Sequence, residues 1–378
     1  MVRRAAFGHG GRIQAVRGEL SWAGTLAAGA SGGPRISEPR SRGVTRRCRV
    51  AIVLAVDVGG TRTRTALVDT ERIRHPLLLR QQPTADIASL TAYLDEMCKT
   101  AAVWPRALAV AVAGPVFGGR SVQVNVNWSV DAEELRTALG IASVRVLNDL
   151  EAAAHALAEL EPEDYVELQP SGLPIEGNRA IIAAGTGLGE AGLYWDGSAH
   201  QPFATEGGHA SFSPTDELEE RLLRWLRKRF DHVSWERVVS GPGLARIFEF
   251  LAEGEGKTDV LHDRLASAED PGDLPAWIAE QAERGDPLCR AALRLFCRLY
   301  GSEAGNLALK LMATGGVYVA GSVAVKNLET LREGAFLEGF RNKGRMRPLL
   351  EAIPVRVVLF EELVLLGAAR CAAKLLVP

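Results

Sequence analysis

The pattern of apolar and polar positions changes abruptly near residue 50. Residues 51–57 read AIVLAVD, a continuous apolar and β-branched run that is typical of a strand buried on both faces. After Gly59 and Gly60, residues 61–69 alternate as TRTRTALVD, so these residues together predict a β-hairpin. Further apolar runs predict buried strands at residues 107–115, 143–148, 180–184, 315–321 and 355–360.

Helical segments alternate with these strands. Asp131 precedes Glu134 by three residues, Leu135 and Leu139 follow, and Gly140 closes the segment, which predicts a short capped helix. Further helices are predicted at residues 150–160, at 214–229 with Pro214 in the first turn, at 287–311 and at 365–376. The alternation of strands and helices predicts an α/β fold, and no internal repeat is visible.

Composition adds limits on size and partners. A chain of 378 residues exceeds the size at which a single core usually divides, so we expect two folded domains. The net charge of −2 gives no indication of nucleic acid or an acidic membrane as partner. Five cysteines without a C-x-x-C pair indicate neither a disulfide framework nor a zinc site, which fits a reducing cytoplasm. Apolar runs stay below the ~20 residues that a membrane-spanning helix needs.

The first fifty residues differ from the rest of the chain. Ten arginines face only Glu19 and Glu38, and no periodic apolar face is present. We interpret residues 1–49 as a disordered basic tail or the product of an upstream start site. An export signal is the alternative, because two arginines precede LSWAGTLAAGAS, but that apolar run is short and three charged residues separate it from the basic end.

Two glycine-rich turns follow buried strands and are candidates for phosphate binding. They are Asp57-Val58-Gly59-Gly60-Thr61 and Gly185-Thr186-Gly187-Leu188-Gly189. Glycine lets the backbone approach a polyanion, threonine and backbone N–H groups donate to phosphate oxygens, and Asp57 could hold Mg²⁺ through water. A simple β-turn with glycine at a positive φ explains the first motif as well.

Residues 187–192 also match G-x-G-x-x-G, the fingerprint of dinucleotide-binding folds. That fingerprint requires a helix after the glycines, whereas residues 191–197 are aromatic and glycine-rich and predict a returning strand. Residues 254–258 contain G-K-T but lack the earlier glycine and the strand of a P-loop, so we interpret them as a loop. Two glycine-threonine turns in two halves of the chain instead predict a nucleotide held between two domains.

Polar residues that a core would not select lie between and after these turns. Asn148 and Asp149 stand where a strand passes into a helix, Glu206 and His209 follow the second turn, and Glu236 precedes VVSGPGL. Amides, carboxylates and imidazole form the paired hydrogen bonds that vicinal hydroxyls need, which indicates a sugar. Taken singly, each is better explained as a cap or a surface residue.

These motifs occur together in an order that resembles the bacterial glucokinase family of the sugar kinase, heat-shock ATPase and actin superfamily. The matching segments, within residues 51–378, are VDVGGT, LAVAGPV, N-x-N-W, LNDLEA, GTGLG, EGGHASF, HVSWERVVSGPGL and VYVAG. The resemblance implies a two-lobed RNase H-like α/β fold of the actin and hexokinase type, with the active-site cleft between the lobes. Residues 50–160 and a C-terminal helix at about 361–378 would form the small lobe, and residues 161–360 the large lobe.

The resemblance also implies an activity. The chain would be an ATP:hexose 6-phosphotransferase that phosphorylates D-glucose at its 6-hydroxyl, the first step of glycolysis, in the cytoplasm. Glucose and ATP would be its small-molecule partners and Mg²⁺ a cofactor, with no nucleic acid or membrane partner, and a homodimer is compatible with the family. A kinase for another hexose or with another phosphoryl donor, and a non-catalytic sugar sensor, are the alternatives.

Residue roles carry over where the motifs match. Asp149 would be the catalytic base, and the other sugar ligands would be Asn148, Glu206, His209 and Glu236. Phosphate and Mg²⁺ would be held by Asp57, Gly59, Gly60, Thr61, Gly185, Thr186, Gly187 and Gly189. Gly321 would lie against the adenosine.

One residue beside the phosphate turn departs from the family pattern. Glu190 stands where family members commonly have a small apolar residue, and a carboxylate there would repel a phosphate. Since side chains alternate along a strand, we expect Glu190 to face solvent. Arg62 and Ser322 depart from the pattern too.

Overall fold

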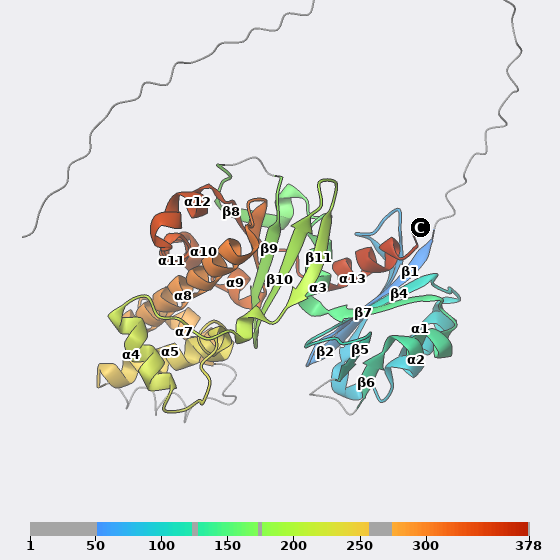
Figure 1. Ribbon diagram of the computed structural model, residues 1–378. Helices are drawn as coiled ribbons and strands as arrows, with labels where there is room; N and C mark the ends of the chain where they lie inside the picture. Colours follow the sequence, from blue (N-terminus) through green and yellow to red (C-terminus); the bar gives the residue numbers. More distant parts are fainter. Residues whose placement is uncertain (1–50, 123–127, 173–175, 257–273, 377–378) are drawn as a thin grey trace, which may run out of the picture. The chain divides into compact units, whose positions relative to one another are not determined.

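The computed structural model describes residues 51–122, 128–172, 176–256 and 274–376 (Figure 1). Predictions for the segment 1–49, for the first three residues of the N-x-N-W motif and for the end of the G-K-T segment lie outside these ranges. In the part that is described, no helix is both long enough and apolar enough to cross a membrane.

The first half of the chain forms a five-stranded sheet in the order β3-β2-β1-β4-β7. The strands are β1 (Ile52–Val58), β2 (Arg62–Asp69), β3 (Pro76–Pro83), β4 (Ala107–Val112) and β7 (Ser143–Asn148). β1 is antiparallel to β2 and parallel to β4, and β4 is parallel to β7. The predicted hairpin is therefore confirmed. β5 (Arg120–Val122) and β6 (Ser129–Asp131) form a separate pair.

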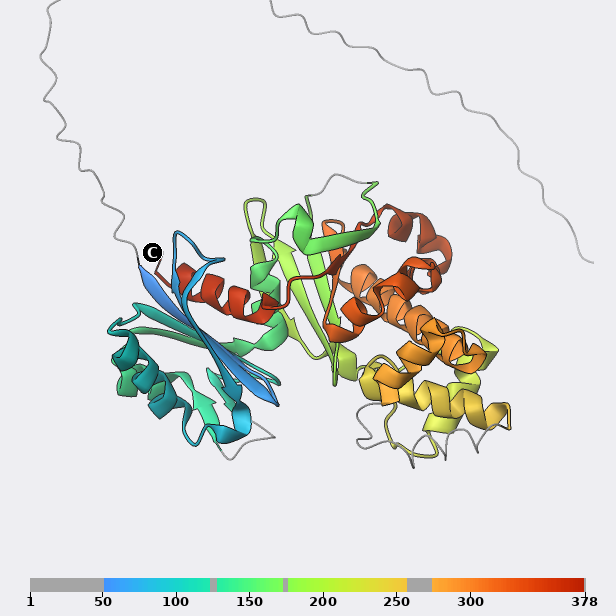
Figure 2. The ribbon, with the colours of Figure 1, turned by 180° about the vertical axis from the view of Figure 1, so that it is seen from behind.

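Helices cover both faces of this sheet. One face packs on α1 (Leu90–Ala101) and α2 (Ala132–Leu139), and the other on α3 (Asp149–Ala156) and α13 (Leu363–Lys374). Because both faces are covered, β1 and β4 are nearly all apolar rather than alternating. Figure 2 shows α13 lying along the sheet.

The second half forms a six-stranded sheet in the order β11-β10-β9-β12-β13-β8. The strands are β8 (Tyr165–Gln169), β9 (Arg179–Ala184), β10 (Leu188–Trp195), β11 (His200–Thr205), β12 (Gly316–Ala320) and β13 (Val355–Val358). β10 is antiparallel to β9 and β11, whereas β12 is parallel to β9 and β13. Across this sheet, β11-β10-β9-β12-β13 have the same order and directions as β3-β2-β1-β4-β7 in the first sheet, although the sequence shows no repeat.

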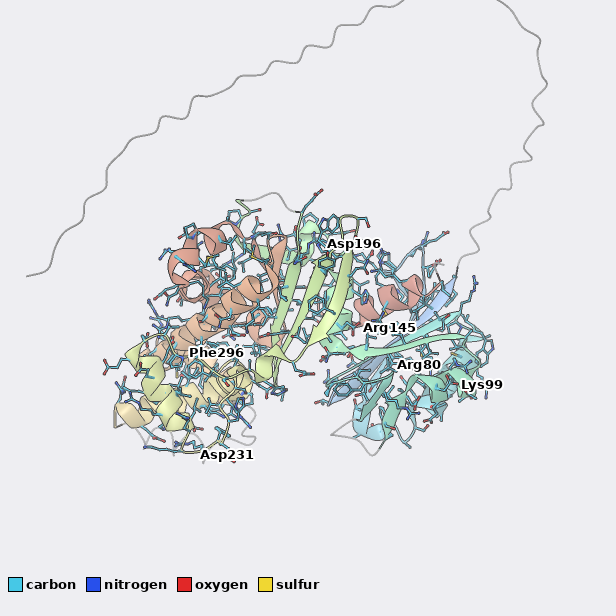
Figure 3. All side chains as sticks on the ribbon, in the orientation of Figure 1. Arg80, Lys99, Arg145, Asp196, Asp231 and Phe296 are labelled. Carbon is cyan, nitrogen blue, oxygen red and sulfur yellow. The ribbon has the colours of Figure 1, made fainter. Side chains whose placement is uncertain are left out.

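A large helical layer packs on one face of the second sheet, and α3 and α13 pack on the other. That layer contains α5 (Gly241–Gly254), α7 (Leu274–Glu283), α8 (Pro287–Leu311) and α11 (Ala335–Arg341). Phe296 of α8 points into this layer, while charged side chains such as Lys99 and Asp231 lie at the surface (Figure 3). The cysteines of the described ranges are free and buried, and they are Cys98, Cys289, Cys297 and Cys371.

Short elements complete the fold. They are η1 (Thr84–Asp86), η2 (Pro162–Asp164), η3 (Gly207–His209), α4 (Glu217–Leu226), η4 (Trp235–Arg237), α9 (Ser322–Lys326), α10 (Leu328–Arg332), η6 (Gly344–Met346) and α12 (Arg347–Ala352).

Helix boundaries follow capping groups. The predicted cap of α2 is present, because Asp131 accepts hydrogen bonds from the N–H of Glu133 at 2.8 Å and Gly140 ends the helix with a φ of 66°. The prediction that Pro214 lies in the first turn of the next helix is wrong. Asp216 caps α4 by accepting from the N–H of Glu219 at 2.9 Å, so the helix begins after the proline.

α3 is fixed between the two sheets by a close helix contact. A Cβ atom on Gly367 of α13 would collide with the carbonyl oxygen of Ala152 in α3, so only glycine allows this approach. Residues of α3 pack on the first sheet through Ala152 and on the second through Leu150 and Ala153. The first turn of α3 therefore has a defined position relative to both sheets.

Candidate active site

Two carboxylates meet at the carboxyl edge of the first sheet. β1, β4 and β7 are parallel, and their register places Val58, Val112 and Asn148 in one row. Asp57 near the end of β1 and Asp149 after β7 therefore lie at the same edge. Burial raises the pKa of Asp57 to about 6, Arg64 at 3.9 Å opposes this shift, and the charge of Asp149 adds to it.

Asp149 is the first residue of α3 and accepts a hydrogen bond from the N–H of Leu150 at 2.9 Å. Burial raises its pKa to about 6, the hydrogen bond from Leu150 opposes the shift, and the charge of Glu206 adds to it. A carboxyl with this pKa is mostly ionised at neutral pH, yet it is basic enough to accept a proton.

Asn148 has mainly structural contacts. Its side-chain oxygen caps α3 by accepting from the N–H groups of Leu150 at 2.8 Å and Glu151 at 3.3 Å, and its amide donates to the carbonyl of Gly114 at 3.1 Å. A side-chain hydrogen bond from Asn148 also opposes the rise that burial causes in the pKa of the neighbouring Asp149, so both residues belong to one hydrogen-bonded group at the start of α3.

The first glycine turn is held by Thr84, a residue that no sequence motif indicated. Thr84 donates from its hydroxyl to the carbonyl of Gly59 at 2.7 Å and from its N–H to the carbonyl of Thr61 at 2.9 Å. Gly59 does not have a positive φ, so the simple-turn explanation fails for it. Its glycine is required because a Cβ atom would lie 2.9 Å from the carbonyl oxygen of Arg62.

The second glycine turn joins β9 to β10 at the carboxyl edge of the second sheet. The predicted return strand is confirmed, since β10 pairs antiparallel with β9, and no helix follows the glycines. A Cβ atom on Gly187 would lie 2.6 Å from Oε2 of Glu236, and one on Gly189 would collide with the side chain of Leu150. This turn is therefore packed against the helix that carries Asp149.

Gly321 lies beside the second turn. It follows β12, which is parallel to β9, and it has a φ of 89°. A Cβ atom there would lie 2.4 Å from the carbonyl oxygen of Ala184, which is too close for any side chain. Both the backbone angle and the close approach require glycine at this position.

The remaining sugar candidates surround the same region. Glu206 and His209 flank η3 with side chains 52% and 60% exposed, and Nε2 of His209 lies 3.8 Å from Oε2 of Glu206. The charge of Glu206 contributes to the raised pKa of Asp149. Glu236 accepts a hydrogen bond from the N–H of Leu188 at 3.1 Å, which ties it to the second glycine turn.

Glu190 does not face solvent as we expected. Its side chain is 1% exposed. The residues of β10 do alternate, but Leu188 and Glu190 point toward the helical layer, and Gly207 lies directly over the carboxyl of Glu190. The prediction was wrong because both faces of this strand are covered.

Sequence reasoning missed Arg64 and Thr84 as residues of this region. Arg64 had a weak signal, since it alternates with Arg62 on the strand that leaves the first turn. Thr84 had none, because it reaches Gly59 across 25 positions. Both act on the first turn through contacts that only the folded sheet creates.

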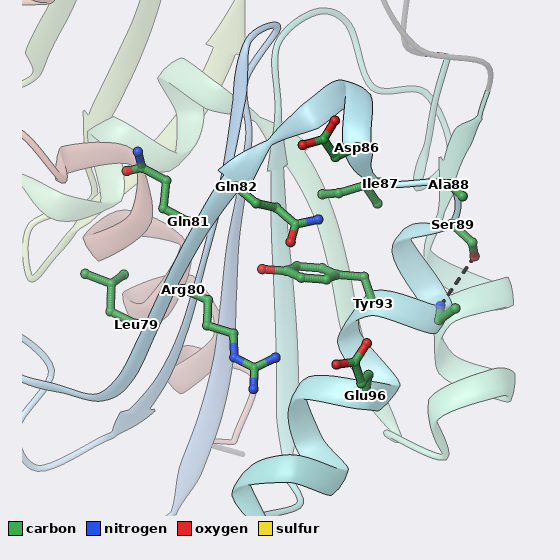
Figure 4. Close-up of a pocket in the computed structure, with 11 residues that line it drawn as sticks. Leu79, Arg80, Gln81, Gln82, Asp86, Ile87, Ala88, Ser89, Tyr93 and Glu96 are labelled. Atoms are coloured by element: carbon green, nitrogen blue, oxygen red, sulfur yellow. Dashed lines mark hydrogen bonds between the residues drawn. The ribbon is translucent and has the colours of Figure 1, made fainter.

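A separate pocket of about 610 Å³ lies at the edge of the first sheet (Figure 4). It is formed by β3, η1 and α1, with Arg80, Gln82 and Tyr93 among its lining side chains, and none of the predicted site residues lines it. Across the described ranges, no group of three or more His, Cys, Asp or Glu side chains is arranged to hold a metal ion.

Comparison with known proteins decides the family. The model of the glucokinase family matches residues 54–375. The chain belongs to the glucokinase family. A glucokinase of Nostoc sp. is 38% identical over 342 residues, which cover 86% of this chain and 100% of that protein. The resemblance inferred from the motifs is thereby confirmed, and the protein is a kinase that phosphorylates glucose.

Solved structures agree on the fold. The crystal structure of a glucokinase from an Antarctic psychrotroph is 31% identical with a TM-score of 0.74, and the match covers 85% of this chain and 99% of that one. A ROK family glucokinase from Streptomyces griseus, solved with glucose and AMPPNP, has a TM-score of 0.58 at 22% identity over 86% of this chain and 100% of that one. The predicted two-lobed α/β kinase fold is confirmed.

Proposed function

We propose that Asp149 activates the 6-hydroxyl of glucose for attack on the γ-phosphate of ATP. The observation that carries this proposal is the position of Asp149, whose pKa burial raises to about 6 and whose helix packs against the second glycine turn through Leu150 and Gly189. A hydroxyl held by Asp149 would thus lie beside a turn suited to phosphate.

The reaction needs one proton transfer. The 6-hydroxyl oxygen forms a bond to the γ-phosphorus, the bond from that phosphorus to the bridging oxygen of ADP breaks, and Asp149 takes the hydroxyl proton. Phosphoryl transfer has a loose transition state, so most of the catalysis comes from alignment and from neutralising charge.

Glucose would contact the side chains of Asn148, Glu206, His209 and Glu236. The open carboxylate and imidazole of η3 and the carboxylate of Glu236 supply acceptors and a donor for vicinal hydroxyls. Glucose and the phosphates would then share Glu236, because that residue also holds the second glycine turn.

ATP would bind across the two glycine turns. Gly59, Gly60 and Thr61 would donate to phosphate oxygens from the first, and Gly185, Thr186, Gly187 and Gly189 from the second, with Gly321 against the adenosine. Mg²⁺, when bound, would neutralise phosphate charge. Asp57 suits it through water, because this partly buried carboxyl has a single cationic neighbour among the described residues, Arg64 at 3.9 Å. AMPPNP in the Streptomyces griseus structure supports ATP as the donor.

The remaining assignments are proposals of the same kind. Residues 50–160 with a C-terminal helix at about 361–378 form the small lobe, residues 161–360 form the large lobe, and residues 1–49 precede them. The protein acts in the cytoplasm without a nucleic-acid or membrane partner, as a homodimer or a monomer.

A coupled assay tests donor and acceptor together. Purified protein is supplied with glucose, mannose or fructose and with ATP, ADP or polyphosphate. We expect glucose with ATP to give the highest kcat/KM. A higher kcat/KM for another hexose or donor would replace this proposal with the alternative, and no turnover with any pair would favour a sugar sensor.

Acidic pH should reduce activity through Asp149. The base must be ionised, so kcat/KM for glucose should fall about tenfold per pH unit below about pH 6 as Asp149 takes up a proton. Asp57 titrates in the same range, so the observed pKa belongs to the pair. Initial rates from pH 4.5 to 8, with the fold monitored by circular dichroism, check this. Constant kcat/KM down to pH 4.5 in folded protein would contradict a pKa of about 6 for an essential base at this site.

A further inference from the structure

Glu190 is a buried carboxyl directly beneath the turn that carries Glu206 and His209. Neither of its carboxyl oxygens has a hydrogen-bond partner among the described residues. A Cβ atom on Gly207 would collide with Oε2 of Glu190, so the carboxyl packs against the backbone of η3. It therefore supports the turn from below.

The backbone of Glu190 holds the same turn from a second side. Its carbonyl accepts a hydrogen bond from the hydroxyl of Thr205 at 3.1 Å, and that hydroxyl accepts from the N–H of Gly207 at 3.3 Å. Glu190 and Thr205 are paired in the β10–β11 register. A shift of Glu190 would be transmitted to Gly207 by both routes.

The charged neighbours of Glu190 come from α8. Glu303 has a partner for each oxygen, with Asn306 donating at 2.7 Å and Lys310 lying at 3.3 Å. Glu190 has no such partner, so of the two carboxyls Glu303 is better suited to hold the negative charge. Burial raises the pKa of Glu190 to about 8, the charge of Glu303 adds to the shift, and Lys310 opposes it.

Other groups near this pair come from α8 and from residue 343. The charge of Glu190 adds to the rise that burial causes in the pKa of Tyr300. The hydroxyl of Tyr300 nevertheless bonds to β9 and β12, and it accepts from the N–H of Ala184 at 3.1 Å. Lys343 donates to Ser302 at 3.2 Å and interacts with Glu303. The residue of η3 that packs against the carboxyl of Glu190 is Gly207, which has no side chain and brings no charge to it. No cation of the described residues bonds to Glu190.

We propose that Glu190 is a positioning residue for glucose, whose uncharged carboxyl supports the Glu206–His209 turn, and that loss of its proton in alkaline solution displaces the turn and weakens glucose binding. An ionised carboxylate has no partner in this place and would be repelled by Glu303, so it must move toward water. The turn covers it, so the turn moves as well. This inference rests on the proposed contact of Glu206 and His209 with glucose.

The test is the pH dependence of the KM for glucose in the parent and in Glu190→Gln. The parent KM should rise above pH 8 and be about tenfold higher at pH 9, because only the protonated form binds well. Glu190→Gln keeps the shape without the charge, so its KM should stay within about twofold from pH 7 to 9. The KM for ATP should change little in either protein.

Three further variants make the result decisive. Glu190→Met, of similar length and apolar, should behave like Glu190→Gln and replaces it if the buried amide prevents folding. Glu249→Gln on α5 is the matched control, since burial also raises the pKa of Glu249 and it lies outside the site, so its profile should follow the parent. Glu206→Gln tests the turn itself and should raise the KM for glucose at every pH.

The outcomes distinguish a failure of the role of Glu190 from a failure of the proposed glucose site. If the parent KM for glucose did not change with pH, or rose equally in the parent and in both Glu190 variants, the role of Glu190 would be overturned. A raised KM for glucose in Glu206→Gln would still support the glucose site in that case. An unchanged KM in Glu206→Gln would instead remove glucose from this turn.

Discussion

Replacing Asp149 with Asn should lower kcat by about 10³-fold or more, because general-base catalysis contributes roughly 10² to 10⁴ and the amide cannot accept the hydroxyl proton. The substitution keeps the size of the side chain and its hydrogen bond from Leu150, which lies at 2.9 Å. Binding of glucose, measured by calorimetry, should therefore stay within about tenfold of the parent value.

The neighbouring residue Glu151 provides the control for Asp149. It lies in the same first turn of α3 and is paired with Arg145, and burial raises its pKa as well. Glu151→Gln should retain kcat within a few-fold if the loss in Asp149→Asn comes from chemistry and not from a damaged helix. Substantial kinase activity in Asp149→Asn would remove Asp149 from the role of base.

The strands and helices that build the site could be predicted because their patterns are local. Residues 51–57 are apolar on both faces, so the buried strand was clear, and Asp131 with Gly140 marked both ends of α2. The aromatic and glycine-rich residues after the second glycine turn were enough to reject a dinucleotide fold. Strand burial, helix caps and tight turns depend on residues that are close together in the sequence, so they can be read from it directly.

Other features depend on contacts across the fold. Thr84 holds the first glycine turn only because β3 returns beside β2, and Glu190 is buried only because η3 and α8 cover β10. The repeat of five strands in both sheets was invisible because topology depends on backbone pairing, and the two sets of residues differ. The family resemblance supplied site residues that pattern alone left as caps or surface groups.

In the proposed site Glu236 contacts glucose and also holds the second glycine turn, so its loss should affect both substrates. The carboxylate accepts from the N–H of Leu188 at 3.1 Å and packs against Gly187. A hydrogen bond to a charged group contributes about 1.5–3 kcal/mol. Glu236→Ala should therefore raise the KM for glucose by about 10–100-fold, and it also frees the turn that holds the phosphates.

Among the sugar candidates, Glu236 differs because its loss removes a contact that holds the second glycine turn. We expect Glu236→Ala to raise the KM for ATP by about tenfold and to lower kcat, because the phosphates are no longer held in line with the hydroxyl. Glu206→Ala should raise the KM for glucose alone, since Glu206 has no contact with the glycine turn among the interactions of the described residues. Steady-state kinetics with each substrate varied at saturation of the other measure both effects. An unchanged KM for ATP in Glu236→Ala would mean that the bond to Leu188 does not position the nucleotide, and Glu236 would then be a glucose ligand only.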